Sequence, residues 1–386
     1  MVLAKIWSES VYVAAAYIAS TKFISMHLAN QVVGFHVVGF VVGGILGGML
    51  VDFFGAKRIF ISSSITIAFT LISLIITSSL YLLKILFFIR AFCIALTYNS
   101  SYGLLLNFYH NNNFGAVMSR FYSVLFFVSS FTPVVIARII EHHSEMMAYL
   151  FIIASILLVY VSIALYHIHD SHVQAIDSFN LYGTKFRLLL SNQEFMTMCI
   201  VSMIGMGGFY GFMPIFSMYI EKYSGSVSLG VIQSIGNVCT VSASIIFASL
   251  KITQINMLRK SILIGMIMII CASTYISIMV TSLVPYAIPG FLVFCIAKGF
   301  THPACKTIAL SQARQISKDN NIALSGMAQS LVTTFNSLLE MVASILLFYD
   351  LFDLFTSAII FTLTIILLAI YIMLNLFEII NQSEAI

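Results

Sequence analysis

The sequence predicts an all-α integral membrane protein with twelve transmembrane helices in two halves of six, on three observations. Of 386 residues, 60% are apolar and 8% are charged, with a mean hydropathy of +1.04. Because soluble proteins have about a quarter of their residues charged, most of this surface must face lipid. Polar clusters cut the chain into twelve apolar segments, each near the roughly 20 residues that cross a bilayer. The longest polar stretch, His169–Asn192, separates six segments from six.

The polar residues between the apolar segments define the boundaries of the twelve spans. We predict spans at residues 2–24, 32–52, 59–80, 82–107, 119–140, 146–168, 194–219, 228–250, 261–281, 284–307, 324–347 and 354–379. The first is the weakest, because Lys5 and Glu9 interrupt it; no small-residue cleavage site follows, so we do not expect a cleaved signal peptide. The predicted domains are residues 1–168, a central loop at 169–193, and residues 194–386.

Orientation follows from the Lys and Arg residues between the spans, since cytoplasmic loops carry an excess of them. One set of connections holds eleven: Lys57, Arg58, Arg120, Lys185, Arg187, Lys251, Arg259, Lys260, Lys306, Arg314 and Lys318. The other set holds four: Lys22, Lys84, Arg138 and Lys222. We therefore expect a multi-pass protein of the inner (plasma) membrane with the central loop and both termini in the cytoplasm.

The connection between the second and third spans reads "GGMLVDFFGAKRIF". Gly48 lets the second span approach a neighbouring helix, and Gly55 allows a tight turn. Asp52 can cap or pair near helix ends, where anions favour N-termini. Lys57 and Arg58 hold the loop in the cytoplasm, which an ordinary positive-inside turn would also do.

The spacing "G-M-L-V-D-F-F-G-A-K-R" at this position resembles the signature loop of the major facilitator superfamily, G-x-L-x-D-R-x-G-R-[RK]. The resemblance implies alternating access, in which two six-helix halves rock about a central site. Phe53 departs from the pattern, because the family usually has a basic residue there. The charge network of this loop is therefore expected to be thinner than usual.

Longer stretches resemble the bicyclomycin-resistance (Bcr/CflA) group of drug–proton antiporters. They are Val11–Arg58, with Tyr12 in place of the tyrosine of D-x-Y-L-P, Gly208–Gly225, Gly299–Leu310 and Ala323–Leu331. The resemblance implies proton-coupled export of a small amphipathic solute. Two departures weaken the inference of export: the acid of D-x-Y-L-P falls at Ser10, beside Glu9, and "SSFTPVVIARII" keeps Pro133 but lacks the antiporter glycines.

Four ionisable residues within predicted spans are candidates for function, because a charge at membrane depth normally faces a cavity or a partner. Arg90 resembles an arginine tied to proton coupling in antiporters, although an arginine at this depth can also snorkel outward. Glu9 is either a proton carrier or an acid at the inner interface. Lys298 and Glu340 lie on sequential spans at depths about 10 Å apart, so they are expected either to take part in coupling or to form a structural pair.

Polar and aromatic residues in the spans are candidates to line a substrate cavity: Tyr12, Tyr98, Asn99, Tyr102, Tyr210, Gln233, Asn237 and Asn336. Each can instead form a hydrogen bond between helices. We expect a monomer in lipid that binds a small molecule and protons.

Several function classes lack the residues they need. The sequence has no phosphate-binding Walker loop, no cluster with metal-ligand spacing and no legible catalytic triad, so we expect no cofactor, no metal and no enzyme activity. The basic residues form no run, which argues against a nucleic-acid partner. Uptake of a metabolite by the same fold remains an alternative, as does a non-transporting membrane protein such as a sensor.

Overall fold

The computed structural model describes residues 26–108, 114–142, 146–167, 180–223, 225–249, 254–280, 284–320, 324–348 and 354–384. These residues form the following elements: α3 (Met26–Phe54), α4 (Ala56–Ile76), α5 (Leu80–Phe108), α6 (Phe114–His142), α7 (Met146–His167), α8 (Asn180–Leu190), α9 (Gln193–Ser202), the π-turn η1 (Met203–Gly207), α10 (Gly208–Tyr223), α11 (Gly225–Ser249), α12 (Ile255–Val280), the 3-10 turn η2 (Val284–Ala287), α13 (Ile288–Asn320), α14 (Ser325–Phe348) and α15 (Leu354–Glu384). The predicted second to twelfth spans each coincide with one of these helices or, for the seventh, with α9, η1 and α10 together. The predicted first span lies outside the described residues.

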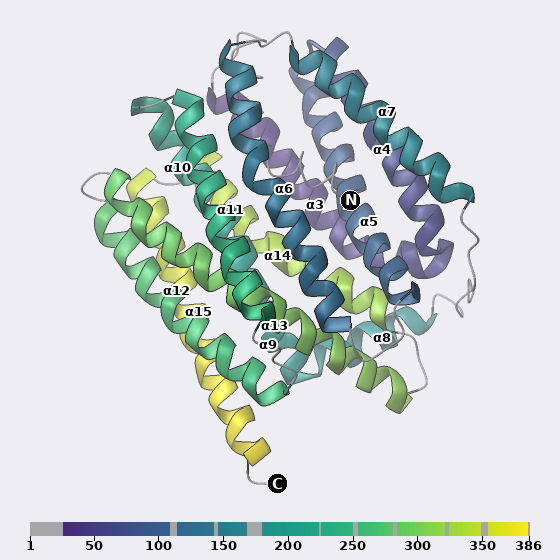
Figure 1. The fold of residues 1–386 in the computed structure, drawn as a ribbon, viewed down its shortest axis with the longest axis vertical. Coiled ribbons are helices and arrows are strands. Elements are labelled where there is room, and N and C mark those ends of the chain that lie inside the picture. Colours follow the sequence, from purple (N-terminus) through teal and green to yellow (C-terminus); the bar gives the residue numbers. More distant parts are fainter. Residues whose placement is uncertain are drawn as a thin grey trace.

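The helices form two halves that lie side by side in Figure 1, with the earlier helices in purple and blue and the later ones in green and yellow. In the first half α5 packs on α3 and α4, and α4 packs on α7. In the second half α13 packs on α11 and α12, and α12 packs on α15. The most extensive contacts between the halves are those of α3 with α14 and of α6 with α11.

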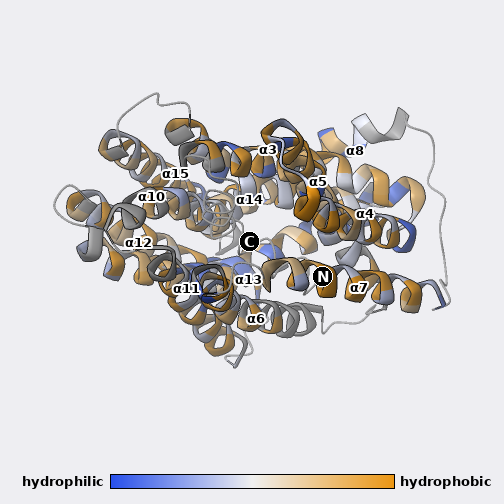
Figure 2. Cartoon of the chain, turned by 90° about the horizontal axis from the view of Figure 1, so that it is seen from above, coloured by the Kyte–Doolittle hydropathy of each residue, from blue (hydrophilic) through white to orange (hydrophobic). Residues whose placement is uncertain are grey.

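Lipid-facing surfaces lie on the outer helices of each half. Phe69 of α4, Ile156 of α7, Ile264 of α12 and Leu367 of α15 are all more than 60% exposed. Figure 2, which looks along the helices, shows hydrophobic colour on these outer helices and hydrophilic colour near α13 and α14. An exposed apolar surface of this extent is stable only in hydrocarbon, and helices satisfy their backbone hydrogen bonds internally there. The structure is therefore that of an all-helical membrane protein.

Within the described residues, nine helical stretches are long and apolar enough to cross a membrane. They lie on α3, α4, α5, α7, α9–η1–α10, α11, α12, α13 and α15. The exceptions among the predicted spans are α6, whose described apolar stretch is only Phe127–Ile139, and α14. Helix α14 carries buried polar side chains, among them Gln329 and Thr333. It packs against α3 of the other half, so its polarity reflects a position between the halves.

One helix was not predicted from the sequence, because α8 lies in the segment taken for a loop. The helix is amphipathic: Lys185 and Leu189 are buried on one side, while Phe186, Arg187 and Leu190 are exposed. We call the end of the molecule that carries α8, the α3–α4 turn and the last turn of α15 the α8 end, which is the lower end in Figure 1.

Candidate functional site

The α3–α4 turn is built by its glycines. Gly55 has a φ of 86°, in the left-handed region that favours glycine, and its N–H donates to the Val51 carbonyl at 2.9 Å. The carboxylate of Asp52 lies against Gly326, where a Cβ would overlap it. Gly326 is in the first turn of α14, so the acid sits at the positive end of that helix. The turn of one half therefore contacts a helix of the other.

The basic residue that the signature has in this turn is absent here, and a lysine of another helix lies near Asp52 instead. Phe53, at the position where the signature has a basic residue, is 58% exposed. Lys185 on α8 is buried and attracts the Asp52 carboxylate electrostatically. Lys57 and Arg58 lie after the turn, and the Lys57 Nζ lies 5.9 Å from the ring centroid of Tyr166. The role of Lys185 was not predicted from the sequence, since α8 itself was not predicted.

Two interleaved rows of glycine on α3 set its packing. Side chains at Gly39, Gly43 and Gly47 would collide with α5, at Phe88, Phe92 and Asn99. Side chains at Gly44 and Gly48 would collide with α14. One row thus packs α3 within its half, and the other brings α3 into backbone contact with the second half. The repeated small-xxx-small spacing in "GFVVGGILGG" was the available signal for this close packing.

Arg90 is fully buried in α5. Its Nη2 lies 3.4 Å from Nδ1 of the buried His36 on α3. Its guanidinium lies 4.4 Å from the ring centroid of Phe87, a favourable cation–π contact. The side chain therefore points into the protein and does not snorkel outward.

Lys298 is fully buried in α13. Its Nζ lies 3.4 Å from the ring centroid of Phe209 and 5.9 Å from that of Tyr210, both on α10. Its Cγ also approaches Gly205 of the π-turn η1, where a Cβ would lie 3.9 Å away. Glu340 is partly exposed on α14, and a direct pair between Lys298 and Glu340 stays a prediction.

The predicted cavity residues fall into three groups. Asn99 and Asn237 join the halves: Thr333 donates to Asn99 Oδ1 at 3.1 Å, and Asn237 donates to the Ser129 carbonyl at 3.1 Å. Both residues therefore form hydrogen bonds between helices, which is the role expected of them as an alternative to lining a cavity.

The other candidates lie within one half or beyond the described part. Tyr98 packs edge-on against Phe40 of α3, with ring centroids 5.9 Å apart. Asn336 is hydrogen-bonded to Ser202, and Gln233 is fully buried. Tyr102 is a helical position of α5 whose side chain is not described, and Glu9 and Tyr12 lie outside the described residues.

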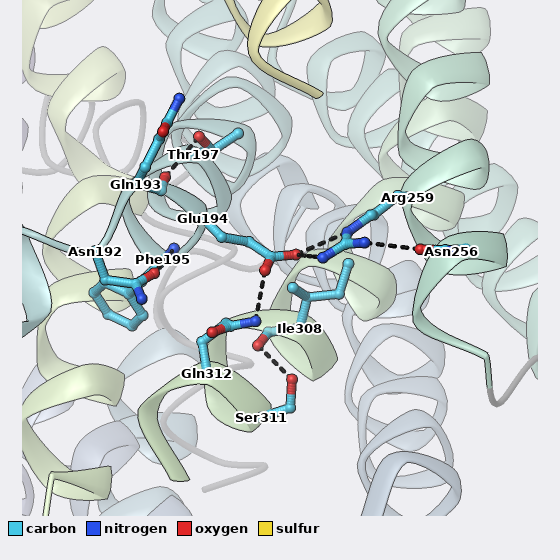
Figure 3. A network of polar contacts seen from close by, with 10 residues as sticks. All are labelled: Asn192, Gln193, Glu194, Phe195, Thr197, Asn256, Arg259, Ile308, Ser311 and Gln312. Atoms are coloured by element: carbon cyan, nitrogen blue, oxygen red, sulfur yellow. Dashed lines mark hydrogen bonds and ion pairs between the residues drawn. The ribbon is translucent and has the colours of Figure 1, made fainter. Parts of the chain in front are cut away.

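A polar network that was not predicted from the sequence lies at the α8 end of the second half (Figure 3). Arg259 Nε donates to Glu194 Oε1 at 2.9 Å, and Nη2 contacts the same oxygen at 2.7 Å. Gln312 donates to Glu194 Oε2 at 2.5 Å. Arg259 Nη1 donates to Asn256 at 2.7 Å. The network therefore ties α9, α12 and α13 together near their ends.

Two helical halves that meet mainly through α3 with α14 and α6 with α11, with buried cations inside, are typical of a polytopic membrane protein of the secondary-transporter class. The comparisons agree. The model of the Major Facilitator Superfamily matches residues 3–344, and the chain belongs to that superfamily. A crystal structure of a mutant of the nucleoside transporter NupG has the same fold, with a TM-score of 0.66 and 16% identity over 97% of each chain. No curated protein sequence gives a significant match.

Proposed function

We propose that the protein exports a small amphipathic solute by alternating access in exchange for protons. One observation carries the proposal: a fully buried cation occurs at matching depth in each half. Arg90 lies ten residues after the start of α5 at Leu80, and Lys298 lies ten residues after the start of α13 at Ile288. Both are thus about 15 Å from the start of their helix.

Buried cations at this depth are costly unless they act on a partner or a ligand. Arg90 stays charged, so it serves by lowering the proton affinity of an acid that approaches it. Glu9, Glu340 and Lys298 are the other coupling candidates, in keeping with the resemblance to the Bcr/CflA antiporters. The protein works as a monomer in this proposal.

The turn at Gly48, Asp52, Gly55, Lys57 and Arg58 is the conformational element of the proposed cycle. Asp52 lies at the N-terminus of α14, in the other half, so its attraction to that helix exists only while the α8 end is closed. The turn therefore biases the balance between the two states of the transporter.

A second candidate function is uptake of a hydroxylated metabolite, and the buried amides favour it. Gln233, Asn237 and Asn99 are at most 2% exposed, and amides bind hydroxyl groups in both donor and acceptor roles. The structural neighbour NupG is described as a nucleoside transporter. The absence of the antiporter glycines around Pro133 is also compatible with uptake.

The test of transport uses the purified protein in liposomes. A proton gradient is imposed, and labelled amphipathic amines, nucleosides and organic acids are screened for movement. Proton-driven movement of an amphipathic solute against the direction of proton flow supports export. Movement with the protons, or accumulation of a nucleoside, supports uptake. No movement of any solute above protein-free liposomes would contradict both.

We also propose that the protein lies in the inner (plasma) membrane with both termini in the cytoplasm, on the eleven-to-four distribution of Lys and Arg. Reporter fusions after Ile386 and near Lys222 are expected to report opposite sides of the membrane. A fusion near Gly183 of α8 is the control and is expected to match the one after Ile386. Reports from the same side for Ile386 and Lys222 would contradict the orientation.

A further inference from the structure

The contact between α3 and α14 contains an unusual hydrogen-bond arrangement. The backbone N–H of Gly48 donates to Oγ of Ser330 at 3.0 Å. The same hydroxyl donates to the carbonyl of Gly44 and lies 3.2 Å from the carbonyl of Ile45. In a regular α-helix the N–H of Gly48 donates to the carbonyl of Gly44. The Ser330 hydroxyl of α14 therefore contacts both groups of one hydrogen-bonding turn of α3, its N–H and its carbonyl.

The bridge is possible because the two helices are in backbone contact. A Cβ at Gly48 would lie 2.6 Å from Cβ of Ser330 and 2.8 Å from the carbonyl oxygen of Gly326. A Cβ at Gly44 would lie 2.8 Å from Oγ1 of Thr334. Ser330 is itself 2% exposed, so water does not compete for its hydroxyl.

Neither helix is left with unsatisfied groups when such a bridge opens. The N–H of Gly48 and the carbonyl of Gly44 are then satisfied within α3, and a serine inside a helix can donate to the carbonyl four residues before it. For Ser330 that carbonyl belongs to Gly326. Because a buried unpaired polar group costs about 1–3 kcal/mol, an exchange that leaves none keeps the closed and open arrangements close in free energy.

We propose that Ser330 is a positioning residue of the transport cycle: its hydroxyl holds the α8 end closed by bonding the backbone of α3 at Gly44 and Gly48, and it turns back to its own helix when the halves separate. The inference rests on the proposed alternating access. It adds a named residue and a reversible exchange of hydrogen bonds to the contact between the halves.

The expected result of Ser330→Ala is a shift toward the state that is open at the α8 end. Alanine fits the space but leaves Gly48 and Gly44 without the bridge when the helices meet. Losing one net hydrogen bond corresponds to a change of about fivefold in the closed-to-open ratio. Ser344→Ala is the matched control, because Ser344 is a buried serine of the same helix whose hydroxyl has no hydrogen-bond partner among the described residues.

Spin-label distances in lipid nanodiscs measure this ratio without any solute. One label pair replaces Ser62 of α4 and Met257 of α12, near the α8 end, and a second replaces Tyr81 and Tyr286, near the opposite end; all four side chains are exposed. Alanine replaces Cys239 and Cys271 in every sample, since the other four cysteines are buried.

For Ser330→Ala we expect more of the long distance in the first pair and more of the short distance in the second, relative to wild type and Ser344→Ala. Distributions equal to those of wild type would overturn the proposal, as would an equal shift in Ser344→Ala. If the shift occurs but no solute moves in liposomes, the Ser330 assignment stands and the proposed transport function fails. If solute moves but the distances stay the same, the reverse holds.

Discussion

Gly48→Leu is expected to abolish transport while leaving the protein folded in the membrane. Leucine is a better helix former than glycine, so α3 itself is not weakened. Its side chain would collide with Ser330 Cβ, with the Gly326 carbonyl and with Met327 Cα, which lies 3.0 Å from a Cβ at this position. Overpacking of this kind costs about 3 kcal/mol, which lowers the closed population about 100-fold.

Solute counterflow in liposomes, at matched amounts of inserted protein, measures this loss. Gly183→Leu in α8 is the matched control, because no atom of the described residues lies within 4 Å of a Cβ there, and it is expected to transport like wild type. Wild-type counterflow by Gly48→Leu would contradict the requirement for backbone contact between α3 and α14.

Glu9→Gln is expected to abolish proton-driven transport while leaving exchange of solute intact. Antiport needs a group that holds a proton in one state and releases it in the other. Arg90 cannot be that group, because a guanidinium stays charged, but its full burial in α5 makes it a strong local influence on an approaching carboxyl. Glu9 is in the same half of the sequence and next to the position where the Bcr/CflA group keeps its acid.

Proton-driven flux and counterflow are measured for each variant in the same liposomes. Glu340→Gln is the comparison, and we expect it mainly to reduce the amount of folded protein, as the predicted structural pair with Lys298 would require. If Glu9→Gln still moves solute against its gradient under a proton gradient, Glu9 is not the carrier. Glu340 would then be the first candidate.

The spans could be predicted because their signal is local. Apolar runs of about 20 residues bounded by polar clusters placed the second to twelfth spans on the helices that the structure describes. The largest error in a bound is at α13, which continues to Asn320, beyond the predicted end at residue 307. Helix α8 was missed for the opposite reason. It is a short amphipathic helix within a polar stretch, so it has no apolar run of its own. Helix α14 was predicted from its boundaries, although its buried polar residues keep it below the usual hydropathy of a span.

The candidate site could be predicted only in part, because its contacts join residues far apart in the chain. The motif indicated that Asp52 belongs near a helix end, but no local pattern indicates that the helix is α14. Ser330 and Gly48 are separated by 282 positions, and Glu194 and Gln312 by 118. Periodicity within one helix predicts which residues share a face, whereas the partner of that face is decided by packing of the whole molecule.

The π-turn η1 determines which side chains of the seventh span share a face. A π-turn accommodates one more residue than an α-helical turn, and one residue corresponds to a rotation of about 100° about the helix axis. Residues after Gly207 are therefore rotated relative to those before Ser202, and this rotation presents Phe209 to Lys298. The faces of the seventh span must therefore be assigned separately on the two sides of η1, for Gln193–Ser202 and for Gly208–Tyr223.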